Sequence, residues 1–322
     1  MRIAITGGTG FVGRHLARRL VGSGHQVVLI ARGRDRRDLG IRDQPGVRFV
    51  SASIDSPAEL ALAFLGCHAV AHLAGVNREL GRQTYARVHV EGTAAVVEAA
   101  RRVGVHKVVL LSFLRARPNC GSAYHESKWA AEEIVRHCDR DWTVVKAGVI
   151  HGSGDHMLDH LSRALHTFPF FLLVGRDRPM APLAVQDAVR VLESALVDGK
   201  MSRQTVSLVG PEQLRLSDAV ARVGLVTGHA PRMLRLPARA HMALARVFER
   251  TMTIPLITRA QVQILDEGVT EASGDSVPVP AELAPTSGFS TDVIRQGLPA
   301  PARFHLRDLR FVRPDRGQPT LS

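Results

Sequence analysis

The residues from Thr6 to Gly13 constrain the fold of this chain more than any other stretch. They read TGGTGFVG and lie between a short β-branched run, Arg2 to Thr6, and a helical pattern that begins at Phe11. A glycine turn that leaves a strand and opens a helix is the local structure that binds the pyrophosphate of a dinucleotide. The sequence therefore predicts a strand, a phosphate-binding turn and a helix within its first residues.

Each glycine of this turn has its own expected role. Gly7 permits the sharp turn, Gly10 lets the backbone approach a pyrophosphate, and Gly13 lets the helix pack close to the sheet. The free N–H groups and the dipole of the helix amino terminus favour a bound anion. We expect a dinucleotide site here, and an ordinary glycine-rich connection is the alternative.

Apolar β-branched runs alternate with helical patterns over the first half of the chain. Strands are expected at residues 2–6, 26–30, 47–50, 69–73, 107–111 and 142–145, with helices at 11–21, 57–65, 78–103 and 122–138. Strands this apolar, separated by helices, are expected to be buried on both faces of a parallel sheet. The expected fold class is α/β, with a doubly wound parallel sheet of the Rossmann type.

The alternation becomes irregular in the second half, where proline and glycine divide shorter elements. We expect residues 1–150 to form the nucleotide-binding domain, with residues 180–210 returning to it. The rest of 151–300 would form a smaller, irregular substrate lobe, interleaved with that domain, over the carboxyl ends of the strands. Residues 301–322, rich in Arg, Pro and Asp, are expected to be a mobile tail.

The basic charge of the chain does not indicate nucleic-acid binding. The formal net charge is +12, and 42 − 4 = 38 of the basic residues are arginine, a skew typical of codon bias. These arginines are scattered, and few aromatic residues accompany them as a stacking platform would. Weak contact with anionic lipid is an alternative, because the apolar helical patterns at 238–248 and 255–265 contain arginines.

Neither a membrane span nor a secretory leader is expected. The longest apolar run, 168–174, is far shorter than the roughly 18 residues that suggest a transmembrane helix. The first residues pass directly into a strand pattern. The three cysteines, Cys67, Cys120 and Cys138, lack metal or redox spacing and suit a reducing compartment. We therefore expect a cytoplasmic protein, at most peripheral to a membrane.

The end of the second expected strand predicts which dinucleotide binds. A site selective for NAD often has a carboxylate there for the ribose hydroxyls, but this strand ends in Ile30, Ala31 and Arg32. Arg32, with Arg34 or Arg36, could instead donate charge-assisted hydrogen bonds to a 2′-phosphate. We expect NADP, bound as NADPH, and favour NAD less; the abundance of arginine in the chain is the alternative explanation.

A tyrosine and a lysine four residues apart, Tyr124 and Lys128, fall on one face of an expected helix. A cationic lysine beside a phenol is expected to lower the pKa of the phenol toward neutrality. The phenol can then exchange a proton with a substrate hydroxyl or carbonyl. The sequence therefore predicts an acid/base pair, and the lysine could also hold the nicotinamide ribose.

Together these motifs resemble the extended or atypical short-chain dehydrogenase/reductases, which include the NAD-dependent epimerase/dehydratase-like proteins. The glycine turn and YHESK at 124–128 carry the resemblance, and HLAG at 72–75 and GVIHGSGD at 148–155 are further matches. The segments at 181–188 and 255–262 are similar to proteins related to the NADPH-binding accessory subunit of respiratory complex I. The resemblance covers about residues 1–290 and implies a Rossmann fold and oxidoreductase or epimerase activity.

The resemblance also implies roles for individual residues. The cofactor phosphates would contact Gly7, Gly10, Gly13 and the backbone of Thr9, Phe11 and Val12. The adenine would lie near Ser53 and Ile54, and the nicotinamide side near Leu73, Ala74, Gly75 and Lys128. For an enzyme, Tyr124 is the expected acid/base, Lys128 its electrostatic partner and Ser112 a hydroxyl that orients the substrate.

Several residues depart from the family pattern. Ser53 stands where an aspartate is common, His89 where many members have an asparagine, and Lys146-Ala147 where Arg-Pro is frequent. Ser112-Phe113 replaces the common serine pair after the fifth strand, so the usual hydroxyl is missing or is provided by Ser112 or Ser122. These departures affect turnover more than cofactor binding.

Two classes of function follow from these observations. An enzyme would reduce, oxidise or epimerise a small molecule such as a quinone, a sugar nucleotide or a ketone. A scaffold or sensor would hold NADPH without turnover. No metal site is expected from the His and Asp residues at 151–160, because Ser153 or Asp155 is better placed to cap a helix and no HExxH motif occurs.

Overall fold

An eight-stranded sheet forms the centre of the computed structural model, which describes residues 1–32, 39–252 and 255–305. The strand order is β14-β11-β6-β5-β4-β1-β2-β3, and every ladder in it is parallel. The strands are β1 (Arg2–Thr6), β2 (Gln26–Ala31), β3 (Val47–Ser51), β4 (Ala69–His72), β5 (Lys107–Phe113), β6 (Asp141–Ala147), β11 (Gln204–Leu208) and β14 (Val277–Pro278). The expected doubly wound Rossmann architecture is confirmed.

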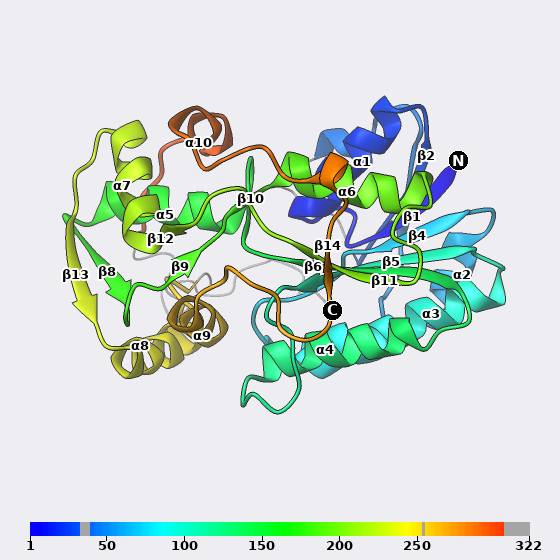
Figure 1. The fold of residues 1–322 in the computed structure, drawn as a ribbon, viewed down its shortest axis with the longest axis horizontal. Helices are drawn as coiled ribbons and strands as arrows, with labels where there is room; N and C mark the ends of the chain where they lie inside the picture. The colour runs from blue at the N-terminus through cyan, green and yellow to red at the C-terminus, as the bar shows by residue number, and fades with distance from the viewer. Residues whose placement is uncertain (33–38, 253–254, 306–322) are drawn as a thin grey trace, which may run out of the picture.

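Helices cover both faces of the sheet. In Figure 1, α1 (Phe11–Gly22) and α6 (Val185–Val197) lie above it, and α2 (Pro57–Phe64), α3 (Gly92–Arg102) and α4 (Ala123–Arg136) lie below. Successive side chains of β1 point to opposite faces of the sheet, so both faces need a covering layer. Ile3 and Ile5 pack against α1 and α6, and Ala4 packs against α2 and α3. Burial on both faces is why the strands read as continuous apolar runs.

The helix expected over 78–103 begins later than the sequence pattern suggests. Leu80 and Gln83 form a β-bridge, and Gly81 between them has a φ of 54°. A left-handed residue cannot continue a right-handed helix. The chain enters a π-helical turn, η2 (Ala86–Glu91), before α3 begins. Such wide turns are frequent at functional sites, and this one carries His89.

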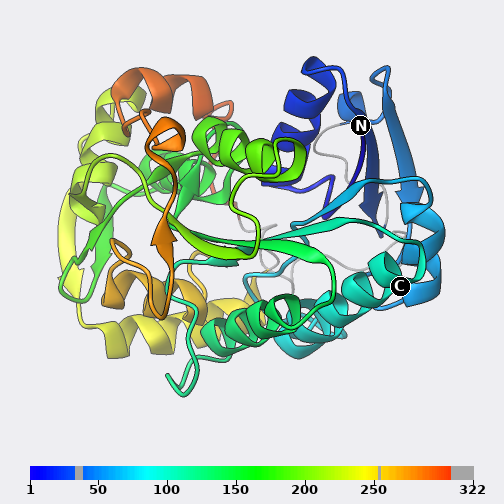
Figure 2. The same cartoon turned by 45° about the vertical axis from the view of Figure 1, so that its right-hand side comes forward.

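A smaller lobe lies beside the carboxyl ends of the strands, as Figure 2 shows. Its helices are α5 (His156–Thr167), α7 (Leu216–Thr227), α8 (Ala238–Thr251), α9 (Arg259–Glu267) and α10 (Thr291–Gly297). Its longer strands, β8 (Phe170–Val174) and β13 (Arg232–Leu236), pair in parallel. Short pieces complete the described chain: η1 (Leu39–Ile41), β7 (Ile150–His151), β9 (Pro179–Met180), β10 (Leu183–Ala184), β12 (Leu214–Arg215) and η3 (Ala281–Leu283).

The division at residue 150 stays a prediction, although α6 and β11 pack on the main sheet. The expected tail beyond residue 305 lies outside the described residues. Among the helices of the described ranges, none is long and apolar enough to cross a membrane.

Candidate functional site

The glycine turn leaves β1 and delivers an open helix amino terminus. Gly7 has a φ of 68°, and a Cβ on it would lie 2.8 Å from the backbone nitrogen of Ala74. A Cβ on Gly13 would lie 2.4 Å from the carbonyl oxygen of Gly7, so α1 packs directly on the turn. Gly10 is the N-cap residue and is exposed. Each of these close approaches requires glycine.

No side chain caps α1 in the described structure, and its first turn contains no carboxylate. The N–H groups of its first turn, at Phe11 and Val12, are therefore not satisfied by a cap. An exposed, uncapped helix start with no negative charge is suited to a pyrophosphate. These residues fit the phosphates of a dinucleotide.

The expected adenosine side of the site is only partly described. Arg32 follows β2 directly and is exposed, whereas Arg34 and Arg36 lie outside the described residues. Ser53 donates its hydroxyl to Asp55, and its N–H donates to the Glu59 carboxylate at 2.9 Å. These two hydrogen bonds hold the segment after β3. The family commonly has an aspartate at the position of Ser53, and this chain has Asp55 two residues later. The contacts of Ser53 and Ile54 with an adenine stay predictions.

The predicted nicotinamide side is the segment after β4, which contains Leu73, Ala74 and Gly75. A Cβ on Gly75 would lie 3.4 Å from Lys128 Nζ and 3.4 Å from His89 Nε2. Lys128 also donates to the carbonyl oxygen of Leu111 at 3.2 Å. Burial lowers the pKa of Lys128 to about 8. The lysine therefore reaches the predicted ribose side as a cation that titrates slightly above neutrality.

Aromatic rings surround Tyr124, which is only 8% exposed. The ring centroids of Tyr85 and Phe113 each lie 5.6 Å from it, and those of His89 and His125 each lie 5.7 Å from it. Burial among these rings raises the pKa of Tyr124. The expected lowering of the Tyr124 pKa toward neutrality is therefore wrong for this structure, because burial of the phenol penalises its charged form and is the largest effect on this pKa.

His89 makes buried hydrogen bonds that the sequence did not reveal. Its Nε2 accepts the N–H of Val76 at 3.1 Å, so its Nδ1 carries the proton and donates to Ser127 Oγ at 2.9 Å. Ser127 in turn donates to the carbonyl oxygen of Tyr124 at 2.9 Å. Burial and the nearby Lys128 charge lower the pKa of His89 to about 2. A neutral imidazole thus ties the segment after β4 to the helix that carries Tyr124 and Lys128.

A cavity of about 400 Å³ joins these groups to the smaller lobe. Tyr124, Lys128 and Gly75 line it on the sheet side. Its smaller-lobe wall is built mainly of apolar side chains: Met157, Leu161, Phe171, Leu172, Val174, Met180, Leu216, Leu256, Ile257, Ala260, Ile264 and Leu265. Tyr124 and Lys128 therefore face a largely aliphatic space.

Comparisons with known proteins agree with this geometry. The sequence model of the NAD(P)H-binding family matches residues 7–162, from the glycine turn through the helix of Tyr124 and Lys128. The ceramide reductase of Caulobacter vibrioides is 30% identical over 235 residues, which are 73% of this chain and 73% of that protein. The chain belongs to the extended short-chain dehydrogenase/reductases.

Other similar proteins are more distant. The 40 kDa subunit of the mitochondrial NADH-ubiquinone oxidoreductase of Neurospora crassa is 22% identical over 261 residues, covering 80% of this chain and 69% of that subunit. The UDP-glucuronic acid 4-epimerase of Bacillus cereus, solved with UDP-glucuronic acid and NAD, has a TM-score of 0.70 at 16% identity and covers 92% of this chain and 98% of its own. At that identity the epimerase shares the fold alone.

Ser112, the expected substrate-orienting residue, lines the same cavity as Tyr124 and Lys128, but its hydroxyl is bonded to a buried side chain. Its hydroxyl donates to Glu132 Oε1 at 2.5 Å. Glu132 is fully buried and also binds Arg136 at 2.7 Å and Lys146 at 3.3 Å. Phe113 packs on Tyr124 with an aromatic ring, at the position where many family members have a hydroxyl.

Ser122, the other candidate hydroxyl, lies at the start of α4. It donates to Gln263 Oε1 at 2.8 Å and contacts His125 Nδ1 at 2.6 Å. Both serines of the short-chain dehydrogenase/reductase pattern are thus bound to other side chains. The structure brings Tyr124, Lys128 and Ser112 to one cavity, with the Ser112 hydroxyl bonded to Glu132.

The histidines at 151–160 have separate surroundings or line the cavity. Asp155 caps α5 through the N–H of Leu158, and the His151 ring packs on Phe289 at 4.8 Å. His160 lines the apolar cavity. Within the described ranges no three His, Cys, Asp or Glu side chains are placed to hold a metal ion.

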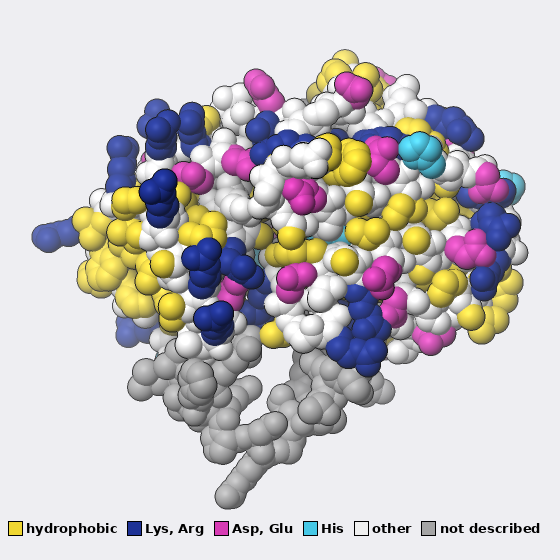
Figure 3. Space-filling view, turned by 90° about the horizontal axis from the view of Figure 1, so that it is seen from below, with side chains coloured by type: hydrophobic (Ala, Val, Ile, Leu, Met, Phe, Trp, Pro, Cys, Tyr) yellow, Lys and Arg dark blue, Asp and Glu magenta, His cyan; other side chains and the backbone are white. Residues whose placement is uncertain are grey.

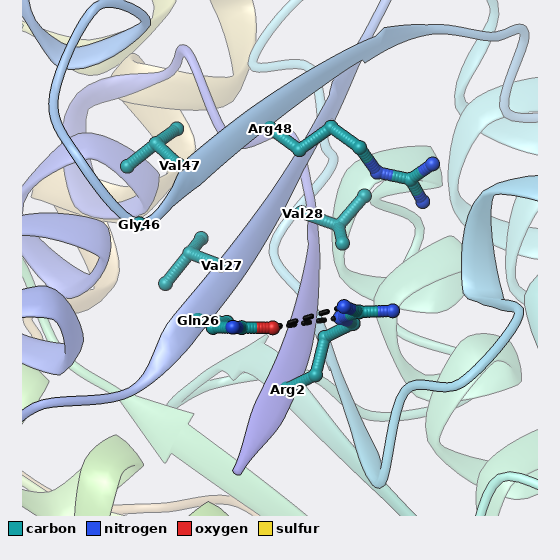
Figure 4. A pocket seen from close by; sticks show the side chains of 7 residues that line it. All are labelled: Arg2, Gln26, Val27, Val28, Gly46, Val47 and Arg48. Carbon is teal, nitrogen blue, oxygen red and sulfur yellow. Dashed lines mark hydrogen bonds between the residues drawn. The ribbon is translucent and has the colours of Figure 1, made fainter.

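A second hollow lies at the opposite edge of the sheet. Figure 4 shows Arg2 and Gln26 within it, where the guanidinium donates to Gln26 Oε1 at 3.1 and 3.0 Å. Its lining comes from the amino ends of β1 to β3, whereas the glycine turn is at their carboxyl ends. Ligands of open α/β sheets bind at the carboxyl ends, so this hollow is not the candidate site.

Proposed function

We propose that this family member is an NADPH-dependent reductase of a carbonyl compound that carries a long apolar portion. The observation that carries the proposal is the placement of Tyr124 and Lys128 on a cavity of about 400 Å³ whose remaining walls are largely aliphatic. An apolar cavity with a few convergent polar groups is typical of a small-molecule site. The name of the ceramide reductase relative supports a lipid-like substrate.

The choice of NADPH is supported by the start of α1 and by Arg32. The uncapped helix would bind the pyrophosphate, and Arg32 would bind the 2′-phosphate by charge-assisted hydrogen bonds. When bound, NADPH supplies a hydride to the carbonyl carbon. Lys128 would orient the nicotinamide ribose, since its Nζ lies beside Gly75 on the predicted nicotinamide side.

Tyr124 would supply the proton. Because burial raises its pKa, the phenol stays protonated at neutral pH and can donate to the carbonyl oxygen as that oxygen gains negative charge. The Lys128 ammonium would stabilise the phenolate left behind. The buried His89 bridge would hold the helix of both residues against the segment after β4. The product is an alcohol, and the phenol regains its proton from water.

A sugar nucleotide is a poorer substrate for this cavity. A nucleoside diphosphate needs cationic or backbone donors for its phosphates. Among the described residues that line the cavity, Lys128 is the single Lys or Arg. Aliphatic walls instead match an acyl chain or an isoprenoid chain, and burial of such a chain contributes about 0.8 kcal/mol for each CH₂ group.

The test measures NADPH oxidation with carbonyl substrates of increasing chain length. We expect kcat/KM to rise with chain length for ketones, and expect no oxidation with UDP-sugars. Tyr124→Phe should lower kcat about 10²- to 10⁴-fold and leave NADPH affinity nearly unchanged, because it removes one hydroxyl and keeps the ring. Phe171→Tyr, which adds a hydroxyl on the cavity wall, is the matched control. Wild-type turnover by Tyr124→Phe would refute the assigned role.

A non-catalytic scaffold or sensor is the second candidate. Two observations favour it: Phe113 packs on Tyr124 where a hydroxyl is common, and a distant relative is a subunit of a respiratory complex. If the protein binds NADPH tightly while no ketone, quinone or lipid carbonyl oxidises it, this second function is the better description.

A further inference from the structure

We propose that the outer face of β13 and α8 docks on an anionic lipid bilayer. The surface consists of the exposed side chains of two consecutive elements, and we call it the α8 face. Its members are Arg232, Leu234, Arg235, Arg239, Ala243, Arg246, Val247 and Arg250. The docking itself does not depend on the proposed function. Only the suggestion that the bilayer supplies an apolar substrate rests on it.

The helix contributes one continuous face. Arg239, Ala243, Arg246 and Arg250 follow one another at intervals of three or four residues, Val247 lies four residues after Ala243, and all are exposed. The opposite face of α8 is buried, with Ala245 fully enclosed and Met242 partly so. The helix is therefore amphipathic, and its outer face carries small apolar side chains among the cations.

The five arginines of the α8 face are unpaired. Within residues 1–32, 39–252 and 255–305, no ion pair or side-chain hydrogen bond holds Arg232, Arg235, Arg239, Arg246 or Arg250. The nearby Glu249 instead binds Arg259 at 2.8 Å. Five uncompensated positive charges on adjoining elements create a local positive potential that attracts an anionic surface.

Apolar side chains stand among these charges. Leu234 is 50% exposed and Val247 is 52% exposed, and Phe170, on the strand that pairs with β13, is 42% exposed. Figure 3 shows hydrophobic side chains gathered at the end of the molecule that holds this lobe, with basic side chains around them. Apolar groups surrounded by arginines match the boundary between acyl chains and anionic headgroups better than an acidic protein surface, which would match the charges alone.

The inner face of α8 is next to the cavity wall. Ala245 packs with Val174 and Val262, and Met242 joins the same cluster with Ile257 and Leu265. Val174, Ile257 and Leu265 also line the cavity of Tyr124 and Lys128. One layer of helix thus separates the α8 face from the cavity, so the proposed bilayer contact lies beside the candidate site.

The experiment is vesicle co-sedimentation of the full chain without substrate. Phosphatidylcholine vesicles are compared with phosphatidylcholine vesicles that contain phosphatidylglycerol, at low and at high salt. The double variant Arg239→Glu/Arg246→Glu is compared with Arg101→Glu/Arg203→Glu, which changes the net charge equally on exposed positions outside the lobe. Circular dichroism and NADPH binding confirm that each variant is folded.

We expect the wild type to bind the anionic vesicles, to bind neutral vesicles weakly, and to release from the anionic vesicles at high salt. The α8 double variant should bind roughly tenfold more weakly or worse, and the control variant should bind like the wild type. Absence of wild-type binding to anionic vesicles, or an equal loss in both variants, overturns the proposal. In the first case the arginines would suit an acidic protein partner.

Turnover separates this proposal from the proposed function. A short, water-soluble ketone needs no membrane, so the α8 double variant should reduce it at the wild-type rate. The same variant should lose activity toward a long-chain carbonyl that is presented in anionic vesicles. Vesicle binding without turnover of any carbonyl would refute the proposed reductase and leave the docking surface established.

Discussion

Lys128 Nζ and His89 Nε2 each lie 3.4 Å from the position that a Cβ would take on Gly75. The backbone after β4 therefore meets a cation and a neutral imidazole at the same point. His89 holds this segment by accepting the backbone N–H of Val76. The Lys128 ammonium lies beside Gly75 of the same segment. This arrangement relates the predicted nicotinamide side to the helix that carries Tyr124.

The first prediction concerns the pH dependence of turnover. Burial lowers the pKa of Lys128 to about 8, so its ammonium loses the proton as the pH rises through that value. The ammonium is the form that supports the phenolate, and kcat should therefore be constant below pH ~8 and fall above it. Lys128→Arg keeps the charge at all accessible pH values and should remove this fall.

The control is the exposed Lys200→Arg, which should keep the wild-type profile. If kcat of Lys128→Arg still fell above pH ~8, the fall would have to come from a group other than Lys128.

The second prediction concerns Ser112. Its hydroxyl bonds to the buried Glu132, so Ser112→Ala should lower the free energy of unfolding by about 1.5–3 kcal/mol, the range for a hydrogen bond to a charged group. Turnover at a temperature where the variant is folded should change little. Denaturant unfolding and kcat are the two measurements. A large loss of kcat with unchanged stability would instead support the substrate-orienting role.

The third prediction concerns cofactor choice. Arg32→Ala should weaken NADPH binding by about 1.5–3 kcal/mol and leave NADH binding nearly unchanged, because only NADPH carries the 2′-phosphate. Titration calorimetry with both cofactors checks this. Arg82→Ala, which removes an exposed arginine elsewhere, is the control. Equal losses for NADPH and NADH would contradict the assignment.

The fourth prediction concerns the glycine turn. A Cβ on Gly10 would meet only the carbonyl oxygen of Gly7, at 3.0 Å, so Gly10→Val should fold. Its branched side chain would occupy the space predicted for the pyrophosphate and should abolish binding of both NADPH and NADH. Gly22→Val is the matched control, since no neighbouring atom lies within 4 Å of its Cβ position. Native circular dichroism with normal NADPH binding by Gly10→Val would place the phosphate site elsewhere.

The sequence by itself determined the Rossmann sheet and its glycine turn. Both depend on local properties: a run such as Gln26–Ile30 must be buried on two faces, and Gly7 must adopt a positive φ. The pairing of Tyr124 with Lys128 on one helix face is equally local, because a helix repeats every 3.6 residues. The helix expected from residue 78 begins later, because Leu80 and Gln83 form a β-bridge although the sequence there has a helical pattern.

Only the tertiary structure decided the pKa values of these groups and their hydrogen-bond partners. The shift of the Tyr124 pKa follows from burial among four rings, Tyr85 and His89 of one turn, Phe113 of β5 and His125 of α4. The partners of Ser112 and His89, and the apolar cavity built from the distant smaller lobe, likewise join residues far apart along the chain. Local patterns specify which chemical groups are present, whereas packing sets their hydration and their hydrogen-bond partners.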